Sequence, residues 1–266
     1  MRYVMPVIHA KADQLNEICG QFPQQPLTQP VFLNSVPKCG THLIRNIVRM
    51  FVPVAQQYHR AFIQYPVLHQ HRAAFDGRAP MLSWGHLLFS DESAQAVHGV
   101  NHVLIVRDPY DWVLARARFF LSDNFQGSLE HLKNGKYSVD QLLNMMIFGI
   151  YDKAPELREI FTHNAVAWLG SSTKLIRYED LVFHLKHIDR GAAEDYFAEL
   201  LASCGVTQLP TDWKQRVLIG SDRKHSATAR ENLSGPQLQW PDELPALQKQ
   251  MVDYVAPGLR AMLGYR

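Results

Sequence analysis

The sequence predicts an α/β fold with a central, mainly parallel sheet, because short apolar runs alternate with segments of helical periodicity. The runs suited to buried strands are VFLNSV (31–36), MLSWGH (81–86), HVLIVR (102–107) and TKLIRY (173–178). Helical patterns occur at 41–51, 108–121, 138–151, 156–168, 192–203 and 243–263. Strands separated by helices are typical of parallel sheets. Ligands of such sheets bind beyond the carboxyl ends of the strands, so the residues that follow the strands are the first candidates for function.

The length and composition allow one large folded domain. The chain has 266 residues, of which 47% are hydrophobic. Residues 1–30, with the Pro/Gln-rich segment QFPQQPLTQP, are expected to form an N-terminal lead-in, and residues 31–266 a single domain. The formal net charge is only +2, and no block of like charge stands out, which disfavours nucleic-acid binding as the main function.

The cysteines and the apolar segments indicate a cytoplasmic protein. Cys19, Cys39 and Cys204 are far apart and have no metal-ligand spacing, which is typical of a reducing compartment. No apolar run reaches the roughly 18 residues that a membrane-spanning helix needs. The first residues, MRYVMPVIHA, lack the apolar core of a secretion signal.

A glycine-containing loop, PKCGT (37–41), joins the first predicted strand to a helix. This arrangement offers backbone N–H groups to a phosphate at a helix N-terminus. A Walker A loop aligned on Gly40 would need Gly at 35, Lys at 41 and Ser or Thr at 42, whereas the chain has Ser35, Thr41 and His42. The hydroxyl that would hold Mg²⁺ is missing from its place, so the loop argues against an ATP-dependent kinase.

The loop resembles the 5'-phosphosulfate loop of PAPS-dependent sulfotransferases (PAPS is 3'-phosphoadenosine 5'-phosphosulfate), whose pattern is Pro-Lys-x-Gly-Thr-Thr or a near variant. The resemblance implies a P-loop-like, three-layer α/β fold and a cofactor-binding loop made of Pro37, Lys38, Cys39, Gly40, Thr41, His42 and Leu43. Lys38 would stabilise charge on the bridging oxygen as the S–O bond breaks. The family often has a second threonine at the position of His42.

Two further segments resemble the family's 3'-phosphate contacts. The strand-ending Arg107, followed by Asp-Pro and a helix, matches the arginine of one segment, and a guanidinium suits bidentate phosphate recognition. The family usually has a serine eight residues later, where this chain has Ala115. In SATARENLSG (226–235), Thr228 and Arg230 match the C-terminal loop, with the basic pair at 223–224 as a rival to Arg230.

The same resemblance suggests a nucleotide contact and a base. In RYEDL (177–181), Tyr178 matches a tyrosine that lies against the nucleotide base, although an ordinary aromatic at a strand end fits the pattern equally well. His86 occupies the place of the family's catalytic histidine, and Trp84 stands where some relatives have a second lysine. The competitors of His86 are His42, His69 and His71.

The function implied is metal-free transfer of a sulfuryl group from PAPS to a hydroxyl of a small-molecule, glycan or lipid acceptor. Lys38 and His86 would be the catalytic residues. The alternatives are a small-molecule kinase and a non-catalytic nucleotide-binding relative, and Ala115 and the missing second lysine are the main arguments for the latter. The sequence does not identify the acceptor or the oligomeric state.

Overall fold

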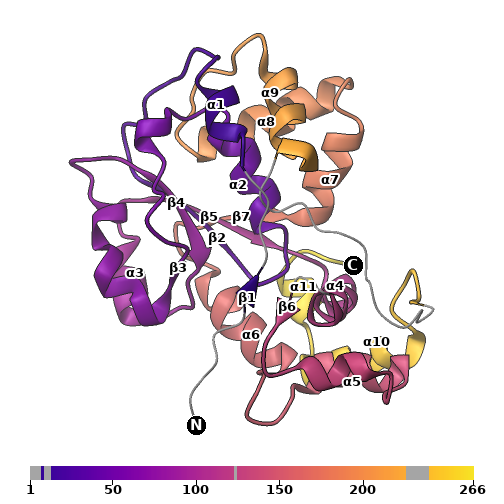
Figure 1. Ribbon diagram of the computed structural model, residues 1–266. Coiled ribbons are helices and arrows are strands. Elements are labelled where there is room, and N and C mark those ends of the chain that lie inside the picture. Colours follow the sequence, from indigo (N-terminus) through magenta and orange to yellow (C-terminus); the bar gives the residue numbers. More distant parts are fainter. Residues whose placement is uncertain (1–6, 9–12, 123–124, 226–239) are drawn as a thin grey trace. The chain divides into compact units, whose positions relative to one another are not determined.

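The computed structural model describes residues 7–8, 13–122, 125–225 and 240–266 (Figure 1). The chain divides into two compact units, each made of separate stretches of sequence. Unit 1 comprises Met1–Lys11, Asp108–Thr162 and Ala229–Arg266, and unit 2 comprises Ala12–Arg107 and His163–Thr228.

Unit 2 contains a five-stranded sheet in which every strand is parallel to its neighbours. Its order is β3 (Ile63–Gln64), β4 (Leu82–His86), β2 (Val31–Ser35), β5 (Asn101–Val106) and β7 (Lys174–Arg177). The predicted α/β class and parallel sheet are confirmed, as are the four predicted strands to within about a residue or two. Because the strands are parallel, their carboxyl ends meet at one edge of the sheet.

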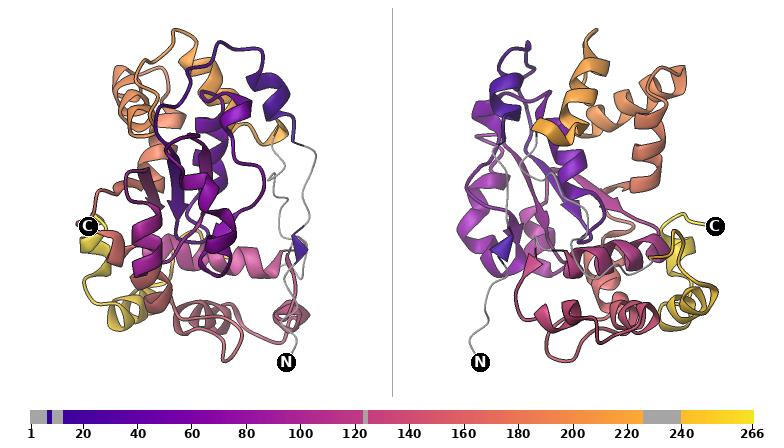
Figure 2. Two further views of the ribbon diagram at one scale, coloured as in Figure 1. Left: turned by 90° about the vertical axis from the view of Figure 1, so that its left-hand side faces the viewer. Right: turned by 45° about the vertical axis from the view of Figure 1, so that its right-hand side comes forward.

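The helices of unit 2 cover the sheet. They are α1 (Leu15–Cys19), α2 (Thr41–Arg49), α3 (Asp91–Ala96), α7 (Tyr178–Lys186), α8 (Gly191–Ser203) and α9 (Trp213–Ser221). The 3₁₀ segments of the unit are η1 (Val54–Gln56), η2 (Tyr65–Phe75), η4 (Val166–Trp168) and η5 (Arg223–His225). Helix α2 packs on β2 and β4 and against α9, and α8 packs against β5. Figure 2 shows these helices beside the sheet from two further directions.

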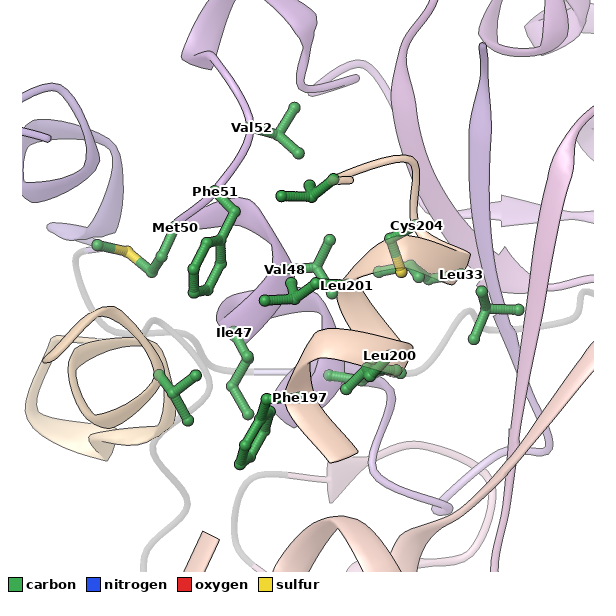
Figure 3. Close-up of a cluster of buried hydrophobic side chains, with 14 of the residues drawn as sticks. Leu33, Ile47, Val48, Met50, Phe51, Val52, Phe197, Leu200, Leu201 and Cys204 are labelled. Carbon is green, nitrogen blue, oxygen red and sulfur yellow. The ribbon is translucent and has the colours of Figure 1, made fainter. Parts of the chain in front are cut away.

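The core of unit 2 fixes the position of α2. Ile47 and Val48 of α2 are fully buried beside Phe197 and Leu200 of α8 and Leu33 of β2 (Figure 3). Burial of each such side chain contributes roughly 1.5–3 kcal/mol to folding. The core therefore holds the start of α2 at the carboxyl edge of the sheet.

The N-terminal part of unit 2 also packs into this core. Leu15 and Cys19 of α1 are fully buried, and Asp13 forms an ion pair with the buried Arg49 at 2.7 Å. The sequence gives little sign of α1 because five residues are too few for a helical period to stand out. The predicted domain boundary at residue 30 stays a prediction.

Unit 1 contains a short antiparallel strand pair and a group of helices. The strands are β1 (Val7–Ile8) and β6 (Phe125–Gln126). The helices are α4 (Pro109–Leu121), α5 (Val139–Phe148), α6 (Leu157–Asn164), α10 (Ala246–Val255) and α11 (Leu259–Met262), with the 3₁₀ segment η3 (Glu130–Asn134). The buried Arg116 of α4 donates hydrogen bonds of 2.8 Å to the carbonyls of Met146 and Pro155.

The single helix predicted at 243–263 is wrong in its extent. The chain forms α10 and α11 with a break between them, where Gly258 has φ +74°. Pro257 just before it has no N–H to donate, and the left-handed backbone of Gly258 ends the helical ladder. No helix in the described part of the chain is both long and apolar enough to cross a membrane.

Candidate active site

The loop between β2 and α2 has an unusual backbone. Lys38 has φ +71° and Gly40 has φ +98°, so both residues are in the left-handed region. For a lysine this conformation costs of order 1 kcal/mol or more, and such strain is common where a loop contacts a ligand. Left-handed residues in a turn make a concave loop for anions, and the first N–H groups of α2 have no acceptor within the helix.

Gly40 is required by its surroundings as well as by its φ. A Cβ atom at this position would lie 2.5 Å from Cδ2 of Tyr178. The tyrosine ring thus lies directly against the loop, and a larger residue than glycine would push them apart.

Arg107 stacks on the same ring. Its guanidinium carbon lies 4.7 Å from the centre of the Tyr178 ring, and its Nε lies 4.0 Å from Oε1 of Glu179. Tyr178 therefore lies between the glycine loop and the arginine, and it links two elements that the sequence analysis assigns to different phosphates.

Hydroxyl groups connect the loop to His86. Ser35, the last residue of β2, contacts the Thr41 hydroxyl through Oγ, and the same Oγ lies 2.8 Å from His86 Nδ1. Nδ1 also lies 2.9 Å from the Ser35 carbonyl oxygen. Because a carbonyl can only accept, we assign the ring proton to Nδ1, which leaves a lone pair on Nε2.

His86 stays neutral over a wide pH range. Burial lowers its pKa to about 4, and the positive charge of Lys38 acts in the same direction. Hydrogen bonds to the backbone of Ser35 and Gly85 oppose this shift. At neutral pH the ring is therefore ready to accept a proton, although it is a weaker base than a free histidine.

A phenylalanine forms one wall beside this histidine. The rings of Phe62 and His86 have centroids 4.7 Å apart in an edge-to-face arrangement, and Phe62 also lies 6.4 Å from His42. Gly85 makes this approach possible, because a Cβ there would lie 1.8 Å from the Ile63 carbonyl oxygen. Strand β3 can thus pair closely with β4 and bring Phe62 to the site.

Comparisons of sequence with family models and with curated proteins find no match. Comparison with solved structures finds matches. The crystal structure of mouse sulfotransferase SULT7A1 complexed with PAP matches 96% of this chain and 94% of that chain, with 13% identity and a TM-score of 0.57. The chain has the fold of a sulfotransferase.

A second structural match is weaker. The crystal structure of retinol dehydratase in complex with androsterone and inactive cofactor PAP matches 80% of this chain and 68% of that chain, with 16% identity and a TM-score of 0.45. The assignment of the sulfotransferase fold depends on the first match alone.

Most of the predicted site residues lie together at the carboxyl edge of the sheet. The loop residues are Pro37, Lys38, Cys39, Gly40, Thr41, His42 and Leu43. His86 ends β4, Arg107 follows β5 and Tyr178 begins α7 directly after β7. Cys39 is fully buried, and burial raises the pKa of its thiol, so this residue is a packing element of the loop and not a nucleophile.

Two predicted contacts, Thr228 and Arg230, lie outside the described residues. The rival pair Arg223 and Lys224 lies in η5. Of the competitors of His86, His71 accepts or donates a hydrogen bond with Tyr58 at 2.9 Å and His69 is exposed. Only His42, through Phe62, is tied to the surroundings of His86 by the ring contacts described above.

Ser35, Phe62 and Glu179 belong to the site but were not predicted from the sequence. Ser35 carries a weak signal, because it is a hydroxyl at the end of an apolar strand and just before the loop. Phe62 carries none, because its position depends on the two-residue strand β3. Within the described ranges, no three His, Cys, Asp or Glu side chains gather in a way that could hold a metal ion.

Proposed function

We propose that this protein is a sulfotransferase that moves a sulfuryl group from PAPS to a hydroxyl of an acceptor. The observation that carries the proposal is the convergence of Lys38, His86 and Arg107 at the carboxyl edge of a sheet with the sulfotransferase fold. The matched mouse structure contains PAP, the product that remains when PAPS has given up its sulfuryl group, and this supports the choice of nucleotide.

The residues present fit a nucleotide that has phosphates at two positions. The left-handed backbone at Lys38 and Gly40 gives the loop the kind of turn that makes a concave anion site, while the space beside Gly40 holds the Tyr178 ring. Residues 37–43 would hold the 5'-phosphosulfate. Arg107 would hold the 3'-phosphate, with Thr228 and Arg230 as further contacts.

Tyr178 has a different place in this proposal from the one its sequence motif suggests. The motif places the tyrosine against the base, whereas its ring lies against Gly40 and under the Arg107 guanidinium. These contacts favour a role between the two phosphate contacts, where the ring fixes their separation. A contact with the base stays a prediction.

The chemistry assigned to the side chains follows from their charge and tautomer. PAPS supplies the sulfuryl group. The acceptor oxygen forms a bond to sulfur as the bond from sulfur to the bridging phosphate oxygen breaks, and the hydroxyl proton moves to Nε2 of His86. Lys38 would stabilise the negative charge that develops on the bridging oxygen. Because Nδ1 of His86 is held by Ser35, Nε2 is the atom that can accept the proton.

The proposal is tested by measuring transfer from labelled PAPS to a panel of small-molecule, glycan and lipid hydroxyl compounds in the presence of EDTA. We expect transfer by the wild type and nearly none by Lys38→Ala, with the same thermal midpoint. A second assay with γ-labelled ATP tests the alternative: transfer of label from ATP that EDTA abolishes, with none from PAPS, would indicate a kinase instead. Tight binding of PAP without transfer to any compound would indicate a non-catalytic relative.

A further inference from the structure

Asn34 is a polar residue at the centre of the buried sheet. It is the fourth residue of β2, the middle strand of the five, and it is 1% exposed in a strand whose residues are all buried. Asparagine is depleted in strands, and a buried amide is costly unless its polar atoms are hydrogen-bonded. A residue that breaks the local pattern in this way calls for a specific role.

The Asn34 amide bonds both backbone groups of Leu87, the residue that follows His86. Its Nδ2 donates to the Leu87 carbonyl oxygen at 3.0 Å, and its Oδ1 accepts from the Leu87 N–H at 2.9 Å. Oδ1 also accepts from the Ser35 N–H at 2.9 Å. Because a carbonyl only accepts and an N–H only donates, these partners fix the orientation of the amide. Trp168 Nε1 donates a further bond of 3.2 Å to the Leu87 carbonyl.

These bonds continue the contact between β2 and β4 past the end of β4. The backbone pairing of the two strands ends with Asn34 opposite Gly85, and β4 ends at His86. Beyond this point the Asn34 side chain takes the place of a backbone partner and holds Leu87. His86 therefore lies between two fixed points of the backbone.

The same amide holds the partner of the His86 ring. The Ser35 carbonyl oxygen lies 2.9 Å from Nδ1, and the N–H of the same serine donates to Asn34 Oδ1. One side chain thus sets both the backbone that carries the imidazole and the backbone that fixes its proton. Lys38 acts on the ring through its charge, whereas the amide is neutral and acts through geometry.

We propose that Asn34 is a positioning residue for the proposed sulfuryl transfer, in which its amide aims Nε2 of His86 at the acceptor hydroxyl. The inference rests on the proposed function and adds to it a buried residue that acts through His86. A displacement of a catalytic group by about 1 Å costs ~100-fold in rate, so loss of the amide should act on turnover far more than on nucleotide binding.

The first test is Asn34→Leu, which keeps the approximate size of the side chain and removes its hydrogen bonds. Transfer from labelled PAPS to the panel of hydroxyl compounds gives kcat, and calorimetry gives the affinity for PAP. We expect kcat to fall about 10- to 100-fold, with PAP affinity close to that of wild type.

Ser83→Ala is the matched control for loss of stability. Ser83 is buried on β4, and its Oγ donates to the Val31 carbonyl oxygen at 3.3 Å. This variant also removes a side-chain hydrogen bond between β2 and β4, but one nearer the amino ends of the strands. Its kcat should match that of wild type.

Asn34→Asp separates positioning from packing. A protonated carboxyl donates and accepts as the amide does, whereas a carboxylate only accepts and would face the Leu87 carbonyl oxygen. Burial raises the pKa of such a carboxyl. The ratio of its kcat to that of wild type should therefore be near one at low pH and should fall as the pH rises.

NMR of protein labelled with ¹⁵N-histidine follows the His86 ring without any transfer. We expect the Nδ1–H tautomer in wild type and a mixture of tautomers in Asn34→Leu. Wild-type kcat in Asn34→Leu, or kcat and PAP affinity that fall together, would overturn the inference. If that variant does not fold, a ratio for Asn34→Asp that is independent of pH overturns it. Absence of transfer by wild type would instead overturn the proposed function, and the tautomers would still decide whether Asn34 positions the ring.

Discussion

His86 shows how a single residue is prepared for one chemical role. The Ser35 carbonyl oxygen fixes the proton on Nδ1, and burial lowers the pKa of the ring to about 4. A base with a low pKa accepts a proton less strongly, but nearly all of it is in the neutral form at neutral pH. The site thus favours availability of the base over its strength.

The acid limb of the pH–rate profile should therefore lie low. For wild type we expect kcat/KM to fall only as the pH approaches about 4, because His86 is neutral above that value. His86→Asn should lower turnover by ~100-fold or more and remove the limb. Ser35→Ala is the matched control, since it keeps the carbonyl that fixes the tautomer, and it should keep the limb. A wild-type limb near pH 6.5 would contradict the buried base.

Arg107 has a competing partner, which gives a pair of opposite predictions. Arg107→Ala should weaken PAP binding by roughly 10- to 150-fold, because a charge-assisted phosphate contact is lost, and should affect 5'-AMP much less. Glu179→Gln should strengthen PAP binding slightly, by about fivefold at most, because it removes a carboxylate 4.0 Å from the guanidinium. Calorimetry with both nucleotides measures these changes. Equal losses for PAP and 5'-AMP in Arg107→Ala would exclude the 3'-phosphate assignment.

At the scale of elements, strand β5 ends beside the site at Arg107 and begins near a second buried histidine, His102. This histidine has no proposed part in catalysis. His102 is 2% exposed, contacts Thr173 Oγ1 at 2.8 Å through Nδ1, and packs edge-to-face on Trp168. Burial lowers its pKa to about 4. The His102 ring thus packs β5 against the 3₁₀ segment η4, and its burial favours the neutral form of the ring.

This histidine should make folding sensitive to acid. In the unfolded chain His102 gains its proton near pH 6.5, and in the folded protein only near pH 4, so stability is lost as the pH falls through this window. The loss expected from His102 between pH 7 and pH 4.5 is about 2 kcal/mol. Urea denaturation at pH 7 and pH 4.5 measures it. His102→Phe should remove much of the difference, and His98→Gln, at an exposed position, should leave it unchanged.

The long elements were predictable from the sequence because their patterns are strong. The buried strands β2, β4, β5 and β7 are continuous apolar runs, and α2 begins directly after the glycine loop. The two-residue strand β3 and the five-residue helix α1 are too short to show a period. Phe62 was missed for the same reason, since only the pairing of β3 with β4 brings it to His86. The hydrogen bonds between Asn34 and Leu87 join residues far apart in the sequence, and no local motif records them.

At the scale of the whole molecule, the fold persists where overall sequence identity is low. The chain matches mouse SULT7A1 over 96% of its length at 13% identity. Within this chain the carboxyl edge of the sheet constrains individual residues closely, as the contact of Gly40 with Tyr178 shows. Side chains away from this edge are constrained mainly by size and polarity, and cores tolerate many such changes.

The composition of the two units has a consequence for the order of folding during translation. Unit 2 is complete once residue 228 has been made, whereas unit 1 also needs Ala229–Arg266. The cost of closing the intervening segment Asp108–Thr162 grows only slowly with its length. We therefore expect a chain that stops at residue 228 to protect the five-stranded sheet from a protease while the segment Asp108–Thr162 is cut.

The full-length chain, treated in parallel, should resist cleavage in both places, and digestion of the sheet in the shorter chain would contradict this order. If the order holds, the ribosome releases the glycine loop, His86 and Arg107 in nearly final form while the last helices are still being synthesised. Nucleotide present in the cell could then bind the nascent chain and stabilise it before synthesis ends.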